Sequence, residues 1–204
     1  MKRLPGVGDG TDLYALTDDA LSLGRPVLDV AKALLGAGIR ILQYREKDKK
    51  AGRMLEECRA LRELTRAAGA CLIVNDHVDI ALLCEADGVH VGQDDMEAGD
   101  VRDMLGMDKI VGVSVQTVEQ AVLAQKRGAD YLGVGAMYPT QTKGDAERVT
   151  KEELQAVRKA IPIPIVAIGG IDKEKAAELM KLGIDGVAVV SAILAQPDIR
   201  KAAG

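Results

Sequence analysis

Short runs of wholly apolar residues alternate with longer amphipathic stretches along this chain, and this alternation constrains the fold more than any other feature. Runs such as residues 71–74 and 110–113 are apolar throughout, which is typical of parallel strands buried on both faces. About eight strand-then-helix units of roughly 25 residues each match the minimum scale of a (β/α)8 barrel. The sequence therefore predicts a single-domain α/β TIM barrel, with an open doubly wound sheet as the structural alternative.

A repeated helix-to-strand junction supports a fold built from equivalent units. The segments EADGV at 85–89, GADYL at 128–132 and GIDGV at 183–187 each link an expected helix to an expected strand. Strands are predicted at residues 13–17, 39–45, 71–75, 88–91, 110–115, 131–136, 163–168 and 187–191. Helices are predicted at residues 26–35, 51–68, 78–84, 96–105, 117–127, 150–160, 173–182 and 193–203. Thr150 and Glu153 have capping-box spacing, and Gln116 or Thr117 is expected to cap the helix that starts beside it.

The ends and the cysteines of the chain bear on its location. Residues 1–12 are predicted to form a flexible, glycine-containing lead-in to a catalytic domain at 13–204. The first ten residues have no apolar run like that of a signal peptide, and no segment has the apolar length that crosses a bilayer. Cys58, Cys71 and Cys84 lack the spacing of a zinc or redox motif. We expect reduced, buried cysteines in a cytoplasmic protein without a membrane partner.

Composition argues against a nucleic-acid partner. The chain has no Phe or Trp and only four Tyr, so it lacks the aromatic surfaces on which single-stranded bases stack. The formal net charge of −4 also lacks the positive excess of a duplex-binding protein. A local group of cations can still hold a small anionic metabolite. The oligomeric state stays open, with a homo-oligomer among the alternatives.

Polar residues follow the second predicted strand, where a TIM barrel carries its active site. Side chains two apart in a strand share a face, so Gln43, Arg45 and Lys47 are expected to point toward the barrel mouth while Tyr44 and Glu46 point away. Two cations on one inner face would repel each other without an anion between them. The alternative is a strand end that is simply solvated.

Carboxylates follow the next two strands. Asp76 ends the third strand after Asn75, and Asp94 and Asp95 follow the fourth, so neighbouring strands bring them together at the mouth. Such a group suits Mg2+, which uses one or two carboxylates together with substrate phosphates. Asp76 could equally be the N-cap of the following helix. His90 is expected to be a hydrogen-bonded residue inside the barrel, and His77 to lie in the first turn of a helix.

Later loops offer a second anion site. The segment after the sixth strand contains hydroxyls, an ammonium group and a glycine, in the residues Thr140, Thr142, Lys143 and Gly144. Ser114 lies near the end of the fifth strand. Gly169 and Gly170 follow the seventh strand, and Ser191 follows the eighth, the region where these barrels frequently bind phosphate. A solvated loop and a glycine turn are the alternatives at these two places.

Several of these segments together resemble the thiamine-phosphate synthase family, in the family's order. They are LYALTD, LQYREKD, LIVNDHVDIAL, ADGVHVGQDD, GVSVQT, GADYLGVGAMYPTQTKGD, VAIGGI and DGVAVVSAIL. The resemblance covers the chain from about Leu13 to Leu194. It implies a TIM barrel that joins 4-amino-5-hydroxymethyl-2-methylpyrimidine diphosphate to a thiazole phosphate, giving thiamine phosphate and pyrophosphate. The implied mechanism is dissociative, with Mg2+ as cofactor and a pyrimidine carbocation captured by the thiazole nitrogen.

The resemblance also implies roles for individual residues. Asp76 and Asp95 would be the Mg2+ ligands, and Arg45, Lys47, Lys143 and Ser114 the catalytic residues. The pyrimidine diphosphate would be met by Gln43, Tyr44, Arg45, Glu46, Lys47, Asn75, Ser114 and Lys143. The thiazole phosphate would be met by Thr140, Gln141, Thr142, Gly170, Val190 and Ser191.

Three other functions fit parts of the pattern. A thiazole tautomerase of the same fold would need neither the metal site nor the pyrophosphate site. A non-catalytic barrel that binds thiamine precursors would keep the same binding groups, so only turnover separates it from an enzyme. A phosphosugar isomerase would need an acid–base pair at the mouth, and the sequence offers no convincing one.

Overall fold

The computed structural model describes Leu4, residues 13–140 and residues 148–203. Eight parallel strands form a closed barrel in chain order. The strands are β1 (Leu13–Leu16), β2 (Ile41–Tyr44), β3 (Cys71–Asn75), β4 (Gly88–Val91), β5 (Ile110–Val115), β6 (Tyr131–Val134), β7 (Ile165–Ile168) and β8 (Gly186–Val189). Leu13 lies opposite Val187, so the first strand pairs with the last and closes the ring. The predicted TIM barrel is confirmed, and the open sheet is wrong.

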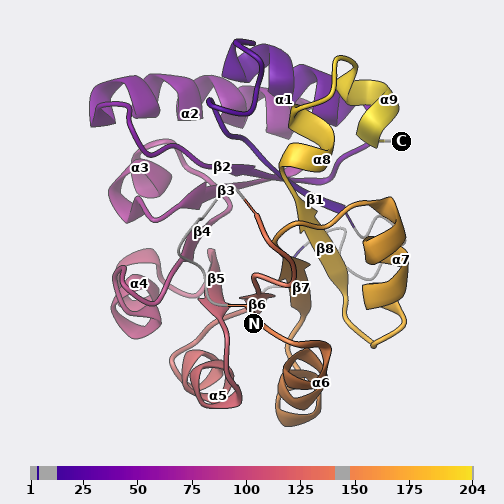
Figure 1. Cartoon of the computed structure of the whole chain (residues 1–204). Coiled ribbons are helices and arrows are strands. Elements are labelled where there is room, and N and C mark those ends of the chain that lie inside the picture. Colours follow the sequence, from indigo (N-terminus) through magenta and orange to yellow (C-terminus); the bar gives the residue numbers. More distant parts are fainter. Residues whose placement is uncertain (1–3, 5–12, 141–147, 204) are drawn as a thin grey trace.

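Helices surround the strands on the outside of the barrel (Figure 1). They are α1 (Val27–Gly36), α2 (Ala51–Ala67), α3 (Val78–Leu83), α4 (Ala98–Leu105), α5 (Val118–Lys126), α6 (Lys151–Ala160), α7 (Lys173–Met180), α8 (Ser191–Leu194) and α9 (Ile199–Ala203). Thr117 caps α5 by accepting the backbone N–H of Gln120. Thr150 and Glu153 form the predicted capping box at the start of α6.

The end of the chain differs from the prediction of one helix over 193–203. The structure has two short helices, α8 and α9, separated by a segment that contains Pro197 and Asp198. Proline lacks the backbone N–H that a helix interior needs, which favours a break at this point. Asp198 accepts the backbone N–H of Lys201 at 3.1 Å and so begins the second helix. α9 then packs against α1.

The core is built from branched aliphatic side chains, because the chain has no Phe or Trp. All four residues of β2, β4, β6 and β8 are buried, as expected for strands covered by helices on one side and by the filled barrel on the other. The tyrosine rings of Tyr14 and Tyr131 occupy the interior, with their centroids 5.9 Å apart. Gly112 leaves room for this packing, since a Cβ there would lie 2.2 Å from a ring carbon of Tyr131.

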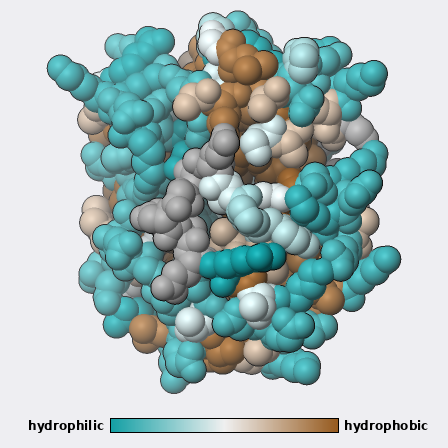
Figure 2. Space-filling view, in the orientation of Figure 1, coloured by the Kyte–Doolittle hydropathy of each residue, from teal (hydrophilic) through white to brown (hydrophobic). Residues whose placement is uncertain are grey.

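The remaining predictions for the chain as a whole can be placed on the structure. Cys58, Cys71 and Cys84 are free and buried. The predicted flexible lead-in lies outside the described residues, apart from Leu4, which is buried in the core. In the part of the chain that the structure describes, no helix combines the length and apolar character of a membrane span. The face turned to the viewer in Figure 2 is mainly hydrophilic, with hydrophobic residues in separate smaller areas.

Candidate active site

A cavity of about 570 Å3 opens at the carboxyl ends of the strands. Its walls come from the ends of all eight strands or from the loops that follow them, which is the usual place of the active site in this fold. The sequence-predicted site residues that line it are Gln43, Arg45, Lys47, Asn75, Asp76, Asp95, Ser114, Thr140, Gly170, Val190 and Ser191. These residues, far apart in the sequence, therefore meet in one cavity.

Two of the predicted residues that the structure describes, Tyr44 and Glu46, do not line this cavity. Tyr44 points to the helix side of β2, where its hydroxyl donates to Glu57 at 2.8 Å. Glu46 is buried beneath the loop that follows β2. A direct contact of these two side chains with substrate is therefore not supported by the geometry. Gln141, Thr142 and Lys143 lie outside the described residues, as does Gly144.

Residues directly after β1 hold Arg45 at the edge of the cavity. Its guanidinium lies 2.7 Å from a carboxylate oxygen of Asp18, and its backbone N–H donates to the hydroxyl of Thr17 at 3.0 Å. Both side chains of the ion pair are mostly buried. Such a hydrogen-bonded ion pair fixes the guanidinium in place. Asp18 is a site residue that the sequence reading missed, although its position directly after a strand was the signal that could have found it.

Lys47 reaches across to the next strand. Its ammonium nitrogen lies 2.6 Å from Oδ2 of Asp76. Asp76 has a left-handed backbone with φ of 62°, a region that Asp and Asn adopt more readily than most residues. The N-cap of α3 is His77. The alternative reading of Asp76 as that N-cap is therefore wrong, and His77 precedes the first turn rather than lying in it.

A second carboxylate lies close to Asp76. Asp95 accepts the backbone N–H of Gly92 at 2.8 Å, which orients its carboxylate beside the loop after β4. Burial raises the pKa of Asp76, and the nearby carboxyl of Asp95 raises it further, while Lys47 opposes the shift. Two carboxylates that disfavour each other's charge form a place where a cation is stabilised. Asp94 also lines the cavity.

A group of charges supports the loop that presents Arg45 and Lys47, with Glu46 and Glu57 buried and Asp19 half exposed. The ammonium of Lys49 lies within 3.1 Å of carboxylate oxygens on Asp19, Glu46 and Glu57. Burial alone would lower the pKa of Lys49, but its hydrogen bonds to these carboxylates outweigh burial and raise it. Glu46 also accepts the backbone N–H of Lys47 at 2.8 Å. Through these two contacts, Glu46 stabilises the loop that follows β2.

The opposite wall contains the two glycines predicted after β7. Gly169 and Gly170 have φ of 101° and 62°, a conformation that favours glycine. A Cβ on Gly170 would lie 2.4 Å from the carbonyl oxygen of Pro139, so this loop packs directly on the loop after β6. Ser191 begins α8, as predicted. Backbone and small side chains therefore form this wall.

A line of hydrogen-bonded side chains crosses the floor of the cavity. The amide of Gln43 donates to the hydroxyl of Tyr14 at 2.8 Å, and the Tyr14 and Tyr131 hydroxyls are 2.8 Å apart. Tyr131 lies 2.9 Å from Nδ1 of His90, whose Nε2 lies 2.8 Å from the hydroxyl of Ser114. The prediction that His90 is hydrogen-bonded inside the barrel is confirmed. Tyr14 and Tyr131 were missed, because apolar strand patterns give no sign of a polar contact across a barrel.

Comparison with known proteins agrees with this geometry. The family model described as thiamine monophosphate synthase matches residues 13–193. A thiamine-phosphate synthase from Lawsonia intracellularis is 53% identical over 197 residues, covering 96% of this chain and 91% of the relative. Another from Moorella thermoacetica is 48% identical over 193 residues, covering 94% of this chain and 92% of that relative.

A solved structure, thiamine phosphate pyrophosphorylase from Pyrococcus furiosus, superposes with a TM-score of 0.87 at 40% identity, covering 94% of this chain and 91% of that one. A 3-hexulose-6-phosphate synthase, at 18% identity and a TM-score of 0.66, shares the fold alone. The match to the family model extends over nearly all of the barrel and includes every strand end that lines the cavity. This chain belongs to the thiamine monophosphate synthase family.

Proposed function

We propose that this chain catalyses the condensation of 4-amino-5-hydroxymethyl-2-methylpyrimidine diphosphate with a thiazole phosphate, giving thiamine phosphate and pyrophosphate. Membership of the family supports the reaction. The observation that carries the assignment to this site is the meeting of Arg45, Lys47, Asp76 and Asp95 at one cavity. Cations beside carboxylates suit a diphosphate that arrives with a divalent metal ion.

Mg2+ is the proposed cofactor, with Asp76 and Asp95 as its protein ligands. The donor set fits, because both residues offer carboxylate oxygens and Mg2+ commonly takes one or two carboxylates and completes its shell with water and phosphate. A cation would relieve the effect of Asp95 on the pKa of Asp76 described above. When bound, the metal would supply positive charge against the phosphate oxygens. Among the described residues, no cluster of three or more metal-ligating side chains is present.

The protein's own cations would stabilise the departing pyrophosphate. As the bond between the pyrimidine methylene carbon and the diphosphate oxygen breaks, negative charge grows on the leaving group. Arg45 is pre-positioned by Asp18, so its charge needs no reorganisation. Lys47 leaves Asp76 and binds a phosphate oxygen. Lys143 is proposed as a third cation on the basis of the family motif.

The thiazole phosphate is proposed to bind at the opposite wall. Gly170, Val190 and Ser191 line the cavity there, together with Thr140 after β6. The glycine conformations let the backbone approach a phosphate closely. This arrangement leaves the thiazole nitrogen free to attack the pyrimidine carbon between the two walls. In the dissociative reaction that we propose, the pyrimidine amino group stabilises the carbocation, and no protein base is required.

The assignment is tested by direct turnover. The purified chain is mixed with both substrates and Mg2+, and thiamine phosphate and pyrophosphate are measured together. We expect the two products in equal amounts and none after the metal is chelated. A protein that binds both substrates without forming product would instead be a non-catalytic barrel. Isomerisation of the thiazole phosphate alone, without metal, would indicate a tautomerase.

The catalytic domain is proposed to span 13–204 and to act in the cytoplasm. The three buried cysteines are free, which suits a reducing compartment. Small molecules are the proposed partners.

A further inference from the structure

The polar line on the cavity floor has a direction. Gln43 donates its amide N–H to the Tyr14 hydroxyl, so the one proton of Tyr14 is available for Tyr131. If Tyr131 accepts that proton, its own single proton is available for Nδ1 of His90. With Nδ1 acting as acceptor, a neutral imidazole carries its proton on Nε2 and donates it to Ser114. Donation by the Gln43 amide is thus consistent with one direction for all the later hydrogen bonds.

The direction matters because a serine hydroxyl has a single proton. If Ser114 accepts from His90, its own proton is free to point into the cavity. If Ser114 donated to His90, only lone pairs would face the cavity, and lone pairs repel an anion. The direction of these hydrogen bonds therefore decides whether Ser114 attracts or repels a phosphate oxygen.

We propose that His90 is a positioning residue: held as the neutral Nε2–H tautomer by Gln43, Tyr14 and Tyr131, it makes Ser114 a hydrogen-bond donor toward an anionic oxygen of the bound diphosphate. The identity of that anion rests on the function proposed above, whereas the tautomer does not. His90 acts through Ser114 and takes no proton from substrate. The hydrogen bonds in this line strengthen one another, because each hydroxyl that accepts a hydrogen bond becomes a better donor.

Two glycines provide independent geometric support. Gly133, on β6, faces the pair, and a Cβ there would lie 3.0 Å from Cε1 of His90 and 3.9 Å from the Ser114 hydroxyl. Gly112, on β5, gives the Tyr131 ring its place across the barrel. Both glycines keep space for polar rings where a TIM barrel usually packs branched aliphatic side chains. Burial also keeps all three side chains neutral: it raises the pKa of Tyr14 and Tyr131 and lowers that of His90.

The tautomer can be observed without substrate. The chain has only two histidines, so a protein labelled with 15N-histidine gives two imidazole signals, and a His77→Asn variant assigns them. We expect the nitrogen signals of His90 to show a protonated Nε2 and an unprotonated Nδ1. In Tyr131→Phe, which removes the donor to Nδ1, both tautomers should appear. A protonated Nδ1 in the unaltered protein, or an unchanged tautomer in Tyr131→Phe, overturns the proposal.

A pair of amide variants tests the role of the donor. In His90→Gln the side-chain N–H reaches the position of Nε2 and can still donate to Ser114, whereas in His90→Asn it reaches only the position of Nδ1. We expect His90→Gln to keep kcat/KM within about threefold and His90→Asn to lose about tenfold, the scale of one hydrogen bond. The affinity for inorganic pyrophosphate with Mg2+, measured by calorimetry, should differ between the variants in the same order.

Ser114→Ala is a control that distinguishes the proposed role of His90 from a purely structural one. Without the hydroxyl, the difference between His90→Gln and His90→Asn should vanish, since the two residues act as a unit. An undiminished difference in the Ser114→Ala background overturns the proposal. If the proposed reaction itself is wrong, the unaltered protein forms no thiamine phosphate, while the 15N signals of His90 still report the tautomer.

Discussion

The ammonium nitrogen of Lys47 lies 2.6 Å from Oδ2 of Asp76 and joins the end of β2 to the end of β3. The same carboxylate is a proposed ligand of Mg2+, so the lysine and the metal compete for one oxygen. Lys47 is half exposed and can swing away, whereas Asp76 is fixed by its left-handed backbone. On this proposal, the free enzyme holds the Lys47 ammonium where the metal would bind, and Lys47 would turn toward the diphosphate when the metal arrives.

Lys47→Met should therefore separate metal binding from turnover. Without the competing ammonium, we expect Mg2+ or Mn2+ alone to bind several-fold more tightly, because Asp76 then has an uncompensated charge. Turnover should fall by about 100-fold, as after loss of one transition-state donor. Calorimetry with metal alone and steady-state kinetics measure the two effects. Weaker metal binding in this variant would contradict the competition.

Asp76→Asn should abolish Mg2+-dependent turnover and leave thermal stability nearly unchanged. Asparagine has the same shape and also tolerates the backbone φ of 62°, so the fold is preserved while the charged ligand is lost. We expect activity to fall by roughly 100-fold or more. A metal titration of activity and a thermal melt check both parts. Near-normal activity would end the assignment of Asp76 as a ligand.

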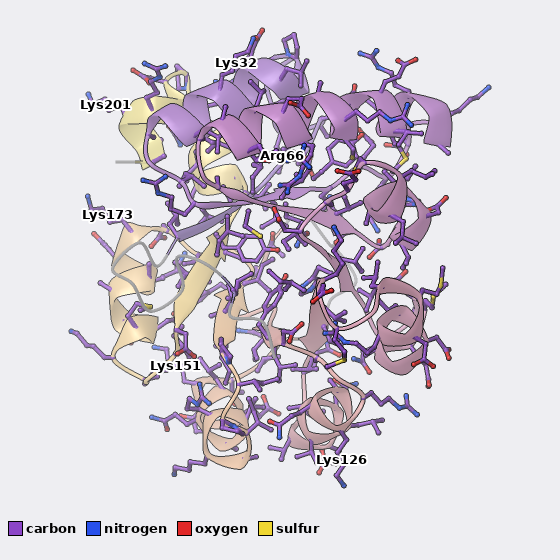
Figure 3. The ribbon with its side chains drawn as sticks, turned by 180° about the vertical axis from the view of Figure 1, so that it is seen from behind. Lys32, Arg66, Lys126, Lys151, Lys173 and Lys201 are labelled. Atoms are coloured by element: carbon purple, nitrogen blue, oxygen red, sulfur yellow. The ribbon has the colours of Figure 1, made fainter. Side chains whose placement is uncertain are left out.

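Lys49→Met should destabilise the fold, because three carboxylates share this one ammonium. Removing one partner of a mostly buried ionic group costs about 3 kcal/mol of unfolding free energy. Lys32→Met is a matched control: its pair with Asp29 is exposed, the side chain points away from the barrel in Figure 3, and its loss should cost less than about 1 kcal/mol. Urea unfolding compares the two. Equal effects would mean that the loop after β2 does not depend on Lys49.

Gly112→Ala should cost about 3 kcal/mol or more of unfolding free energy. The new methyl group would lie 2.2 Å from a ring carbon of Tyr131, and neither the strand nor the buried ring can move freely. Gly52→Ala provides the opposite control, because nothing lies within 4 Å of its Cβ position in α2. That change should stabilise the protein by about 0.5 kcal/mol. Thermal melts of the two variants should move in opposite directions.

Stability should fall in acid through His90. Burial lowers its pKa to about 4 from the ordinary value of 6.5. Between these values the unfolded chain binds a proton that the folded protein excludes, so this part of the stability is complete above pH 6.5 and is lost as the pH falls toward 4. The loss amounts to roughly 3 kcal/mol. Metal-free unfolding curves should converge for His90→Gln and the unaltered protein as the pH falls, and parallel curves would contradict this account.

Elements with an apolar pattern were predicted well from the sequence. The bounds of β3, β4 and β5 match the prediction at both ends, since each strand is a short and mainly apolar run. The two-residue spacing that starts in β2 correctly predicted that Gln43, Arg45 and Lys47 face the cavity. Parallel strands make this possible, because their carboxyl ends meet at one side of the barrel.

Contacts between distant side chains could not be predicted in the same way. The family motif includes Glu46, but the structure places its carboxylate beneath the loop, against Lys49. The hydrogen bond between Tyr14 and Tyr131 joins residues on opposite sides of the ring of strands. Neither spacing nor charge reveals such contacts, since they depend on which interior positions glycine leaves empty.

Pairing of β1 with β8 has a consequence for synthesis of the protein. The first strand emerges from the ribosome before its second neighbour, β8, has been translated. Until then β1 and β7 each have an exposed edge that can pair with another chain. We therefore expect nascent chains that stall before β8 to depend on chaperones, and the pocket to be completed only after β8 has been translated.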